Sequence, residues 1–179
     1  MNWKHAIGVA GLMAALTVGA LQVIPGPKPS NPPVAAHSRL ETHVSVPPIV
    51  AGVIERACRD CHTNETRWPW YSRIAPASWA VAGDVNKARE SLNFSYWSER
   101  NGKTPGSAMG TLTAACANVQ GGRMPLPRYT MLHPEAKLSK SEVEAFCAWT
   151  KTETRRLAEI QRERHKQLAA TPAETPAVN

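Results

Sequence analysis

The sequence is poor in aromatic and acidic residues. Aromatic side chains make up 6% of its 179 residues, and 21 lysines and arginines outnumber 14 acidic residues, for a formal net charge of +7. Such a charge favours anionic partners or an anionic membrane surface. No basic run is interleaved with aromatic residues, so the pattern expected of a nucleic-acid-binding surface is missing. We therefore expect no nucleic-acid partner.

Strand patterns and internal repeats are also missing. No segment alternates apolar and polar residues convincingly enough to predict a half-buried strand, and no motif recurs at a fixed period. Apolar residues recur instead at helical spacing. The sequence therefore predicts an all-α fold.

Only one long hydrophobic run is present, and it lies near the N-terminus. Lys4 precedes an uncharged run of 19 residues from Ala6 to Ile24, which Pro25-Gly26-Pro27 ends. As a helix rising about 1.5 Å per residue, this run nearly spans a hydrocarbon core about 30 Å thick. This favours an uncleaved signal anchor with its basic end in the cytoplasm. The small residues Val18-Gly19-Ala20 leave a cleaved signal peptide as the alternative. Both interpretations export the rest of the chain.

Composition divides the chain into four parts. Residues 1–24 form the signal anchor or signal peptide, and residues 25–45 form a proline-rich linker that should hold the domain off the membrane. Residues 46–155 carry the helical periodicity and are expected to form the domain. Residues 156–179 combine the charged end of the last helix with a disordered tail from Thr171 onwards.

About four helices are predicted within residues 46–155. The first begins at Pro47-Pro48, because proline suits an opening turn, and the second begins near Pro76. The third follows a turn over residues 101–106 and ends at Gly121-Gly122, and the last begins with a capping box of Ser139 and Glu142. Their apolar stripes are Val50, Val53, Ile54 and Ala57; Val81, Val85, Ala88 and Leu92; Met109, Leu112, Cys116 and Val119; and Val143, Phe146, Cys147 and Thr150.

The motif that carries chemistry is Cys58-Arg59-Asp60-Cys61-His62, a C-x-x-C-H sequence. This is the attachment signature of c-type haem. Two cysteines three residues apart at a helix end present their sulfurs to one side, at a separation that suits the two vinyl groups of a porphyrin. The histidine that follows can then reach the iron. The motif predicts one covalent haem c bound through Cys58 and Cys61, with His62 as an axial iron ligand.

Two other uses of a C-x-x-C pair fit the sequence less well. A thioredoxin-like redox pair lies between a strand and a helix, whereas an amphipathic helix runs into this motif. A zinc site needs further cysteine or histidine ligands in a paired spacing, whereas Cys116 and Cys147 stand alone on separate predicted helices. Haem attachment is therefore the favoured interpretation.

The few aromatic residues crowd just after the motif. Trp68, Trp70, Tyr71 and Trp79 lie within twelve residues of one another. Such clustering is typical of residues that wall a core or a flat cofactor.

Beyond the motif, the sequence resembles the bacterial haem-binding domain family of exported single-haem proteins. The resemblance covers most of the chain up to about Trp149. The segments that carry it are Gln22–Pro25, Asn31–Val34, Cys58–Trp97, Gly122–Pro127 and Leu132–Ala136. It implies a haem-binding, cytochrome c-like bundle of about four helices around one haem, preceded by an N-terminal hydrophobic helix. It implies little about physiology.

A cytochrome c-like chain supplies the second axial ligand from a loop between its two C-terminal helices, often as methionine followed by proline. Met124-Pro125 matches this description. The neighbouring glycines and prolines predict a stiff, extended loop, which disfavours the alternative that Met124 is an ordinary core residue. A thioether ligand favours ferrous iron and raises the potential. Met131 and His133 are the alternatives, whereas Met109 lies on a helix stripe and is expected in the core.

The remaining histidines and arginines are weaker candidates for contact with the haem. His37, His43 and His165 lie in segments expected to be mobile or charged, so we expect them to be solvated. The arginines that follow the motif could neutralise the haem propionates or lie free at the surface; they are Arg67, Arg73 and Arg89.

Two cysteines lie outside the motif, on the buried faces of separate predicted helices. In an oxidising compartment, Cys116 and Cys147 are expected to pair, and the bridge would tie the third helix to the last one. The alternative is two buried thiols that act as small apolar residues.

The favoured function is one-electron transfer, because methionine and histidine together leave no iron position for a substrate. The protein would act with unidentified redox partners on the periplasmic side of the bacterial inner membrane, anchored by its N-terminal helix, or in the soluble periplasm after cleavage. It would not be an enzyme in its own right. The main alternative is a haem enzyme or ligand-binding protein with an open or displaceable sixth iron position. A haem-bearing sensor or assembly factor, with the charged last helix as its contact surface, is a third possibility.

Overall fold

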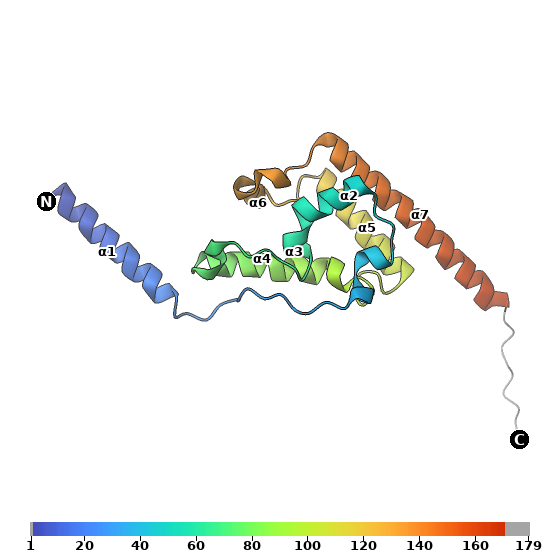
Figure 1. Ribbon diagram of the computed structural model, residues 1–179, viewed down its shortest axis with the longest axis horizontal. Coiled ribbons are helices and arrows are strands. Elements are labelled where there is room, and N and C mark those ends of the chain that lie inside the picture. Colours follow the sequence, from blue (N-terminus) through green and yellow to red (C-terminus); the bar gives the residue numbers. More distant parts are fainter. Residues whose placement is uncertain (1, 171–179) are drawn as a thin grey trace, which may run out of the picture.

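Helices make up all the regular structure of residues 2–170, the part of the chain that the computed structural model describes. This confirms the predicted all-α class and the N-terminal apolar helix (Figure 1). In chain order the elements are α1 (Trp3–Leu21), η1 (Ala36–Ser38), η2 (Leu40–Thr42), α2 (Pro48–Val53), η3 (Ile54–Cys58), α3 (Arg59–His62), η4 (Trp70–Arg73), α4 (Ala77–Ser91), η5 (Phe94–Tyr96), α5 (Pro105–Gln120), α6 (Pro127–Leu132), η6 (Pro134–Ala136) and α7 (Lys140–Ala170). The tail predicted to be disordered from Thr171 onwards lies outside the described residues.

Helix α1 stands apart from the domain and buries none of its residues (Figure 1). Within the described residues it is the one helix long and apolar enough to cross a membrane, with a mean hydropathy of 1.5. A signal anchor and a signal sequence both require such a helix, so the structure agrees with either interpretation.

The proline-rich segment after α1 lies along the domain and does not project as a free spacer. The Asn31 side chain donates to the Thr66 carbonyl at 3.0 Å and accepts from Nε1 of Trp68 at 3.0 Å. Further along, within the predicted linker, Leu40 and Val44 are buried in the core. They reach it because η1 and η2 fold this segment back against the domain before α2 begins.

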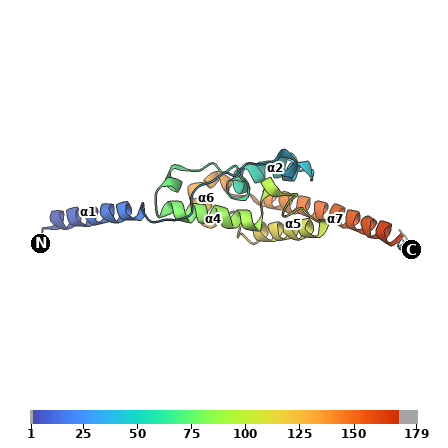
Figure 2. The same ribbon diagram turned by 90° about the horizontal axis from the view of Figure 1, so that it is seen from below.

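The core lies between α2, α5 and α7. Helices α5 and α7 lie side by side in both views (Figure 1 and Figure 2). Its buried apolar residues are Leu40, Val44, Val50, Val53, Phe94, Trp97, Ala108, Leu112, Val119, Phe146 and Trp149. Met109, expected in the core, is only half-buried, because the neighbouring Ala108 occupies the inner position.

Capping residues set the starts of the two long domain helices. Ser139 and Glu142 form the predicted capping box, because the backbone N–H of each residue donates to the side chain of the other. Helix α5 begins at Pro105 with a second capping box of Thr104 and Ser107. This helix therefore starts inside the turn predicted over residues 101–106, because Thr104 caps it before Gly106 is reached.

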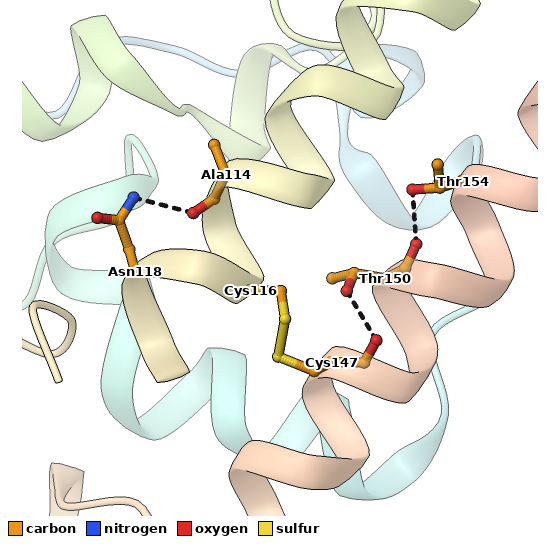
Figure 3. The surroundings of a disulfide bond; sticks show 6 residues. All are labelled: Ala114, Cys116, Asn118, Cys147, Thr150 and Thr154. Carbon is orange, nitrogen blue, oxygen red and sulfur yellow. Dashed lines mark hydrogen bonds between the residues drawn. A yellow bond between two sulfur atoms is a disulfide. The ribbon is translucent and has the colours of Figure 1, made fainter. Parts of the chain in front are cut away.

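A disulfide joins α5 to α7, as the favoured interpretation of the spare cysteines predicted. Cys116 and Cys147 are bonded, and their Cα atoms lie 5.1 Å apart (Figure 3). Both residues face inward between the two helices, where the S–S bond crosses the gap.

Candidate functional site

The C-x-x-C-H motif occupies the end of the helix that begins at Pro48. That helix continues from α2 through the π-helical turn η3, which ends at Cys58, into α3, which holds Cys61 and His62. Single π-helical turns of this kind occur often at functional sites. The turn widens the helix just where the motif begins.

Both motif cysteines are free, half-buried thiols. Burial raises the pKa of Cys58 to about 12, and burial together with Asp60 raises the pKa of Cys61 to about 11. Reactive cysteines of redox C-x-x-C pairs have lowered pKa values. The surroundings of this pair therefore differ from those of a thiol–disulfide exchange site.

The imidazole of His62 is held in one orientation by the backbone of Leu92, the residue that follows α4. Its Nδ1 lies 2.9 Å from the Leu92 carbonyl oxygen, to which it donates. Metal-binding histidines commonly donate the second ring N–H to such an acceptor, which fixes the tautomer and leaves Nε2 for the metal. Burial lowers the pKa of His62, so the ring is neutral at neutral pH, the form that binds a metal.

Two adjoining cavities border His62, and Met124 and Ser91 line both of them. The first has a volume of about 240 Å³ and is lined by Cys61. The second has a volume of about 280 Å³ and is lined by Cys58. We call the pair the motif cleft.

Apolar side chains from α4 and α5 wall the motif cleft. Ala88 of α4 borders the first cavity, and Leu92, Ala115 and Val119 border the second. The apolar stripe predicted for the second helix thus faces cavities along much of its length. Its residue Val85 lines a third cavity, beside the motif cleft. A flat, mostly apolar cofactor fits such walls.

The candidates for a second iron ligand separate by position. Met124 is half-buried and shares both cavities of the motif cleft with His62. Met131 is 80% exposed on α6. His133 borders the third cavity, stacks on Tyr129 and contacts the Tyr71 hydroxyl at 3.3 Å. Of the three, the structure brings Met124 to the same space as His62.

The third cavity, of about 190 Å³, adjoins the motif cleft through Cys61 and Tyr129. Tyr71, a member of the aromatic cluster, lines this cavity. The expectation that the cluster walls a core or a flat cofactor does not hold for Trp70, which is 76% exposed. Trp79 packs on Gly26 instead, since a β-carbon at that glycine would overlap its indole ring.

Arg89 is a structural residue of this region. It is 8% exposed, and its guanidinium donates to the carbonyl oxygens of Thr63 and Ser30, to the Thr66 hydroxyl and to the Asn31 side chain. These bonds tie α4 to the segment after the motif and to the proline-rich segment. With its donors used in this way, Arg89 is not free to pair with a propionate.

The cations that line the motif cleft are Lys87 and Arg128. Arg128 donates to both carboxylate oxygens of Asp84, at 3.0 and 2.7 Å, so Lys87 is the one of the two without an ion pair among the described residues. Arg67 pairs instead with Asp60, and Arg73 is exposed away from the motif cleft. Sequence reasoning missed both cleft cations. Nothing in the local sequence marks them, because their place depends on how α4 and α6 meet.

The three histidines expected to be solvated are all exposed. They are His37, His43 and His165. The first two lie in ordered turns: Nε2 of His43 lies 2.7 Å from the His37 carbonyl oxygen.

The fold and the site define a helical domain built to enclose a cofactor beside a C-x-x-C-H motif. The profile of the haem-binding domain family matches residues 16–152, which is most of the chain. The protein belongs to this family, and its cofactor is haem. No curated protein and no solved structure gives a significant match.

Proposed function

We propose that the protein is a c-type cytochrome that carries single electrons. In this proposal Cys58 and Cys61 bind one haem covalently, and His62 and Met124 are its axial ligands. The observation that carries the proposal is that His62 and Met124 line the same two cavities, each bordered by one motif cysteine. Family membership supplies the haem itself.

The chain's residues have distinct tasks in this proposal. Cys58 and Cys61 would hold the haem through thioether bonds to its two vinyl groups. His62 binds iron through Nε2 while its Nδ1–H stays on the Leu92 carbonyl, and Met124 supplies a soft sulfur that favours the ferrous state. Lys87, which is exposed and lines the motif cleft, would pair with a propionate carboxylate. The bound haem supplies reversible one-electron redox chemistry.

The proposed location is the outer face of a bacterial inner membrane, with α1 as the anchor. Helix α1 has the length and composition of a membrane span. A disulfide between Cys116 and Cys147 suits an oxidising compartment. Unidentified redox proteins would be the electron donor and acceptor.

A ligand-binding haem protein is the second candidate, and the third cavity favours it. This cavity adjoins the motif cleft and has Tyr71, Tyr129 and His133 in its lining. If Met124 left the iron, a small ligand could enter through this space. The two functions differ in whether iron has a free coordination position.

Replacement of Met124 by alanine tests the proposal. The parent ferric protein is expected to be low-spin with a near-infrared sulfur-to-iron band. Met124→Ala should make it high-spin or water-ligated, abolish that band and lower the potential. Carbon monoxide should then bind the ferrous form readily.

Met131→Ala and His133→Ala are the matched controls, and both should keep the parent spectrum. If His133→Ala destroys the low-spin spectrum while Met124→Ala keeps it, the ligands are two histidines and the methionine assignment is wrong. If the parent is already high-spin, the ligand-binding function replaces electron transfer.

A further inference from the structure

We propose that the domain rests on the bilayer through a second contact besides α1, a face formed by η4 and α6. We call it the membrane face and define it by four residues: Trp70, Ile74, Met131 and Leu132. This inference rests on the proposed anchoring by α1. It adds a defined orientation of the domain on the membrane.

The membrane face is unusually apolar for a surface in water. Trp70 is 76% exposed, Ile74 43%, Met131 80% and Leu132 65%. Large apolar side chains exposed in one region of a surface mark interaction sites.

The two parts of the membrane face lie together although about 60 residues separate them in the chain. The Tyr71 hydroxyl, in η4, lies 3.3 Å from Nε2 of His133, the residue after α6. Both residues line the same cavity. This contact brings Trp70 and Leu132, their respective chain neighbours, to the same end of the domain.

The end of α1 is fixed beside the membrane face. The Gln22 side chain donates to the Ala75 carbonyl oxygen at 3.2 Å and accepts from the Ala75 backbone N–H at 3.0 Å. Gly26 then packs on the indole of Trp79. The chain that leaves α1 therefore attaches at once to the loop between η4 and α4, next to Ile74.

The membrane face lies at the end of the domain that is nearest the C-terminal end of α1. In Figure 1, α6 and the first turn of α4 lie at the end of the domain nearest α1, and the C-terminal end of α7 lies at the opposite end. Figure 2 shows the same order along the molecule. If α1 crosses the bilayer, the surface of the bilayer lies at its C-terminal end, against this part of the domain.

The chemistry of the neighbouring residues suits a lipid surface better than a soluble partner. Val23 and Ile24, 83% and 49% exposed, continue the apolar surface from α1 towards the domain. Trp70 belongs to a residue type enriched at the membrane–water interface. Lys28 and Arg73 are exposed and line one groove beside it, where they can contact anionic headgroups. This continuity with α1 identifies the bilayer as the occupant.

Photolabelling from the lipid phase tests the membrane face. The full haem-loaded chain is reconstituted in vesicles of phosphatidylcholine and phosphatidylglycerol that contain a diazirine phospholipid. After irradiation, mass mapping of tryptic peptides is expected to find lipid adducts on α1, on the peptide of residues 68–73 and on that of residues 129–137. The peptides of residues 157–166 in α7 should carry none.

The pattern of adducts separates failure of this inference from failure of the anchor. Adducts on α1 alone would overturn the membrane face and leave the anchor intact. An absence of adducts from α1 would overturn the anchor and, with it, the inference.

A variant tests whether the exposed side chains themselves make the contact. Trp70→Ser with Met131→Ser changes two exposed positions and should reduce adducts on the two domain peptides several-fold, with the α1 adducts unchanged. The control Ile160→Ser, at a 41% exposed site on α7, should leave all adducts as they are. Unchanged labelling of the domain peptides in the double variant would overturn the proposal.

Discussion

Removal of the disulfide should destabilise the domain by an amount that the structure allows us to calculate. The bond between Cys116 and Cys147 closes a loop with a sequence separation of 31 residues (Figure 3). In the chain-entropy model, a closed loop of that length stabilises the fold by roughly 3.7 kcal/mol at 25 °C, because the unfolded chain loses conformations. The variant Cys116→Ala with Cys147→Ala should lose about this much.

Urea denaturation of the haem-loaded protein measures the loss. With a urea slope of about 2 kcal/mol/M, the midpoint of the variant should fall by roughly 2 M. A phosphine reductant added to the parent should have a similar effect, since thioether bonds to haem resist reduction. The reductant should leave the midpoint of the double variant unchanged.

Two results would refute this reasoning. Equal midpoints for the parent and the double variant would show that the bridge adds no stability. Alkylation of both cysteines in the exported parent without prior reduction would show that no bridge forms; mass mapping of the non-reduced protein is expected to find a peptide pair joined by it.

Three further predictions concern other parts of the molecule. Haem should stay with the parent through acid–acetone extraction and be released from Cys58→Ala with Cys61→Ala; haem that extracts freely from the parent would contradict covalent attachment. Arg89→Ala should lower the free energy of unfolding by about 2–4 kcal/mol, because buried oxygen atoms lose their donor, and Arg89→Lys should recover only part of this in urea titrations. The pKa of Glu142 is lowered, mainly by the hydrogen bond from the Ser139 backbone N–H. This carboxylate therefore stabilises the fold above its ordinary pKa of 4.5. In urea titrations, the stability advantage of the parent over Glu142→Gln should stay constant above that pH and shrink as the pH falls below it.

Local patterns in the sequence were enough to predict the motif and the main helices of the domain, but not α6, which lies in the stretch expected to be a loop. Pro48 at the start of α2, the capping box of Ser139 and Glu142, and Gly121 at the end of α5 act within one or two turns of chain. Helical periodicity therefore gave the all-α class correctly. The start of α5 was missed by two residues because Thr104, a strong cap, was assigned to the turn.

The candidate site was only partly within reach of the sequence. The spacing of Cys58, Cys61 and His62 is a local feature, and the family match supports the haem that it predicts. The hydrogen bond from His62 to Leu92 joins residues 30 apart, so no local pattern encodes it. Sequence alone proposed Met124 by its proline neighbour, whereas the cavities that it shares with His62 are lined by residues far apart in the chain and form only when the domain folds.

The sequence by itself predicted the main helical segments and the motif residues proposed to bind haem, since both depend on neighbours along the chain. The tertiary structure alone decided that Arg89 is locked into the fold, that Lys87 and Arg128 line the motif cleft, and that the proline-rich segment lies along the domain. These outcomes depend on which groups meet across long stretches of chain. The sequence does not show whether an arginine faces water or four oxygen acceptors, because only the packed structure brings those acceptors together.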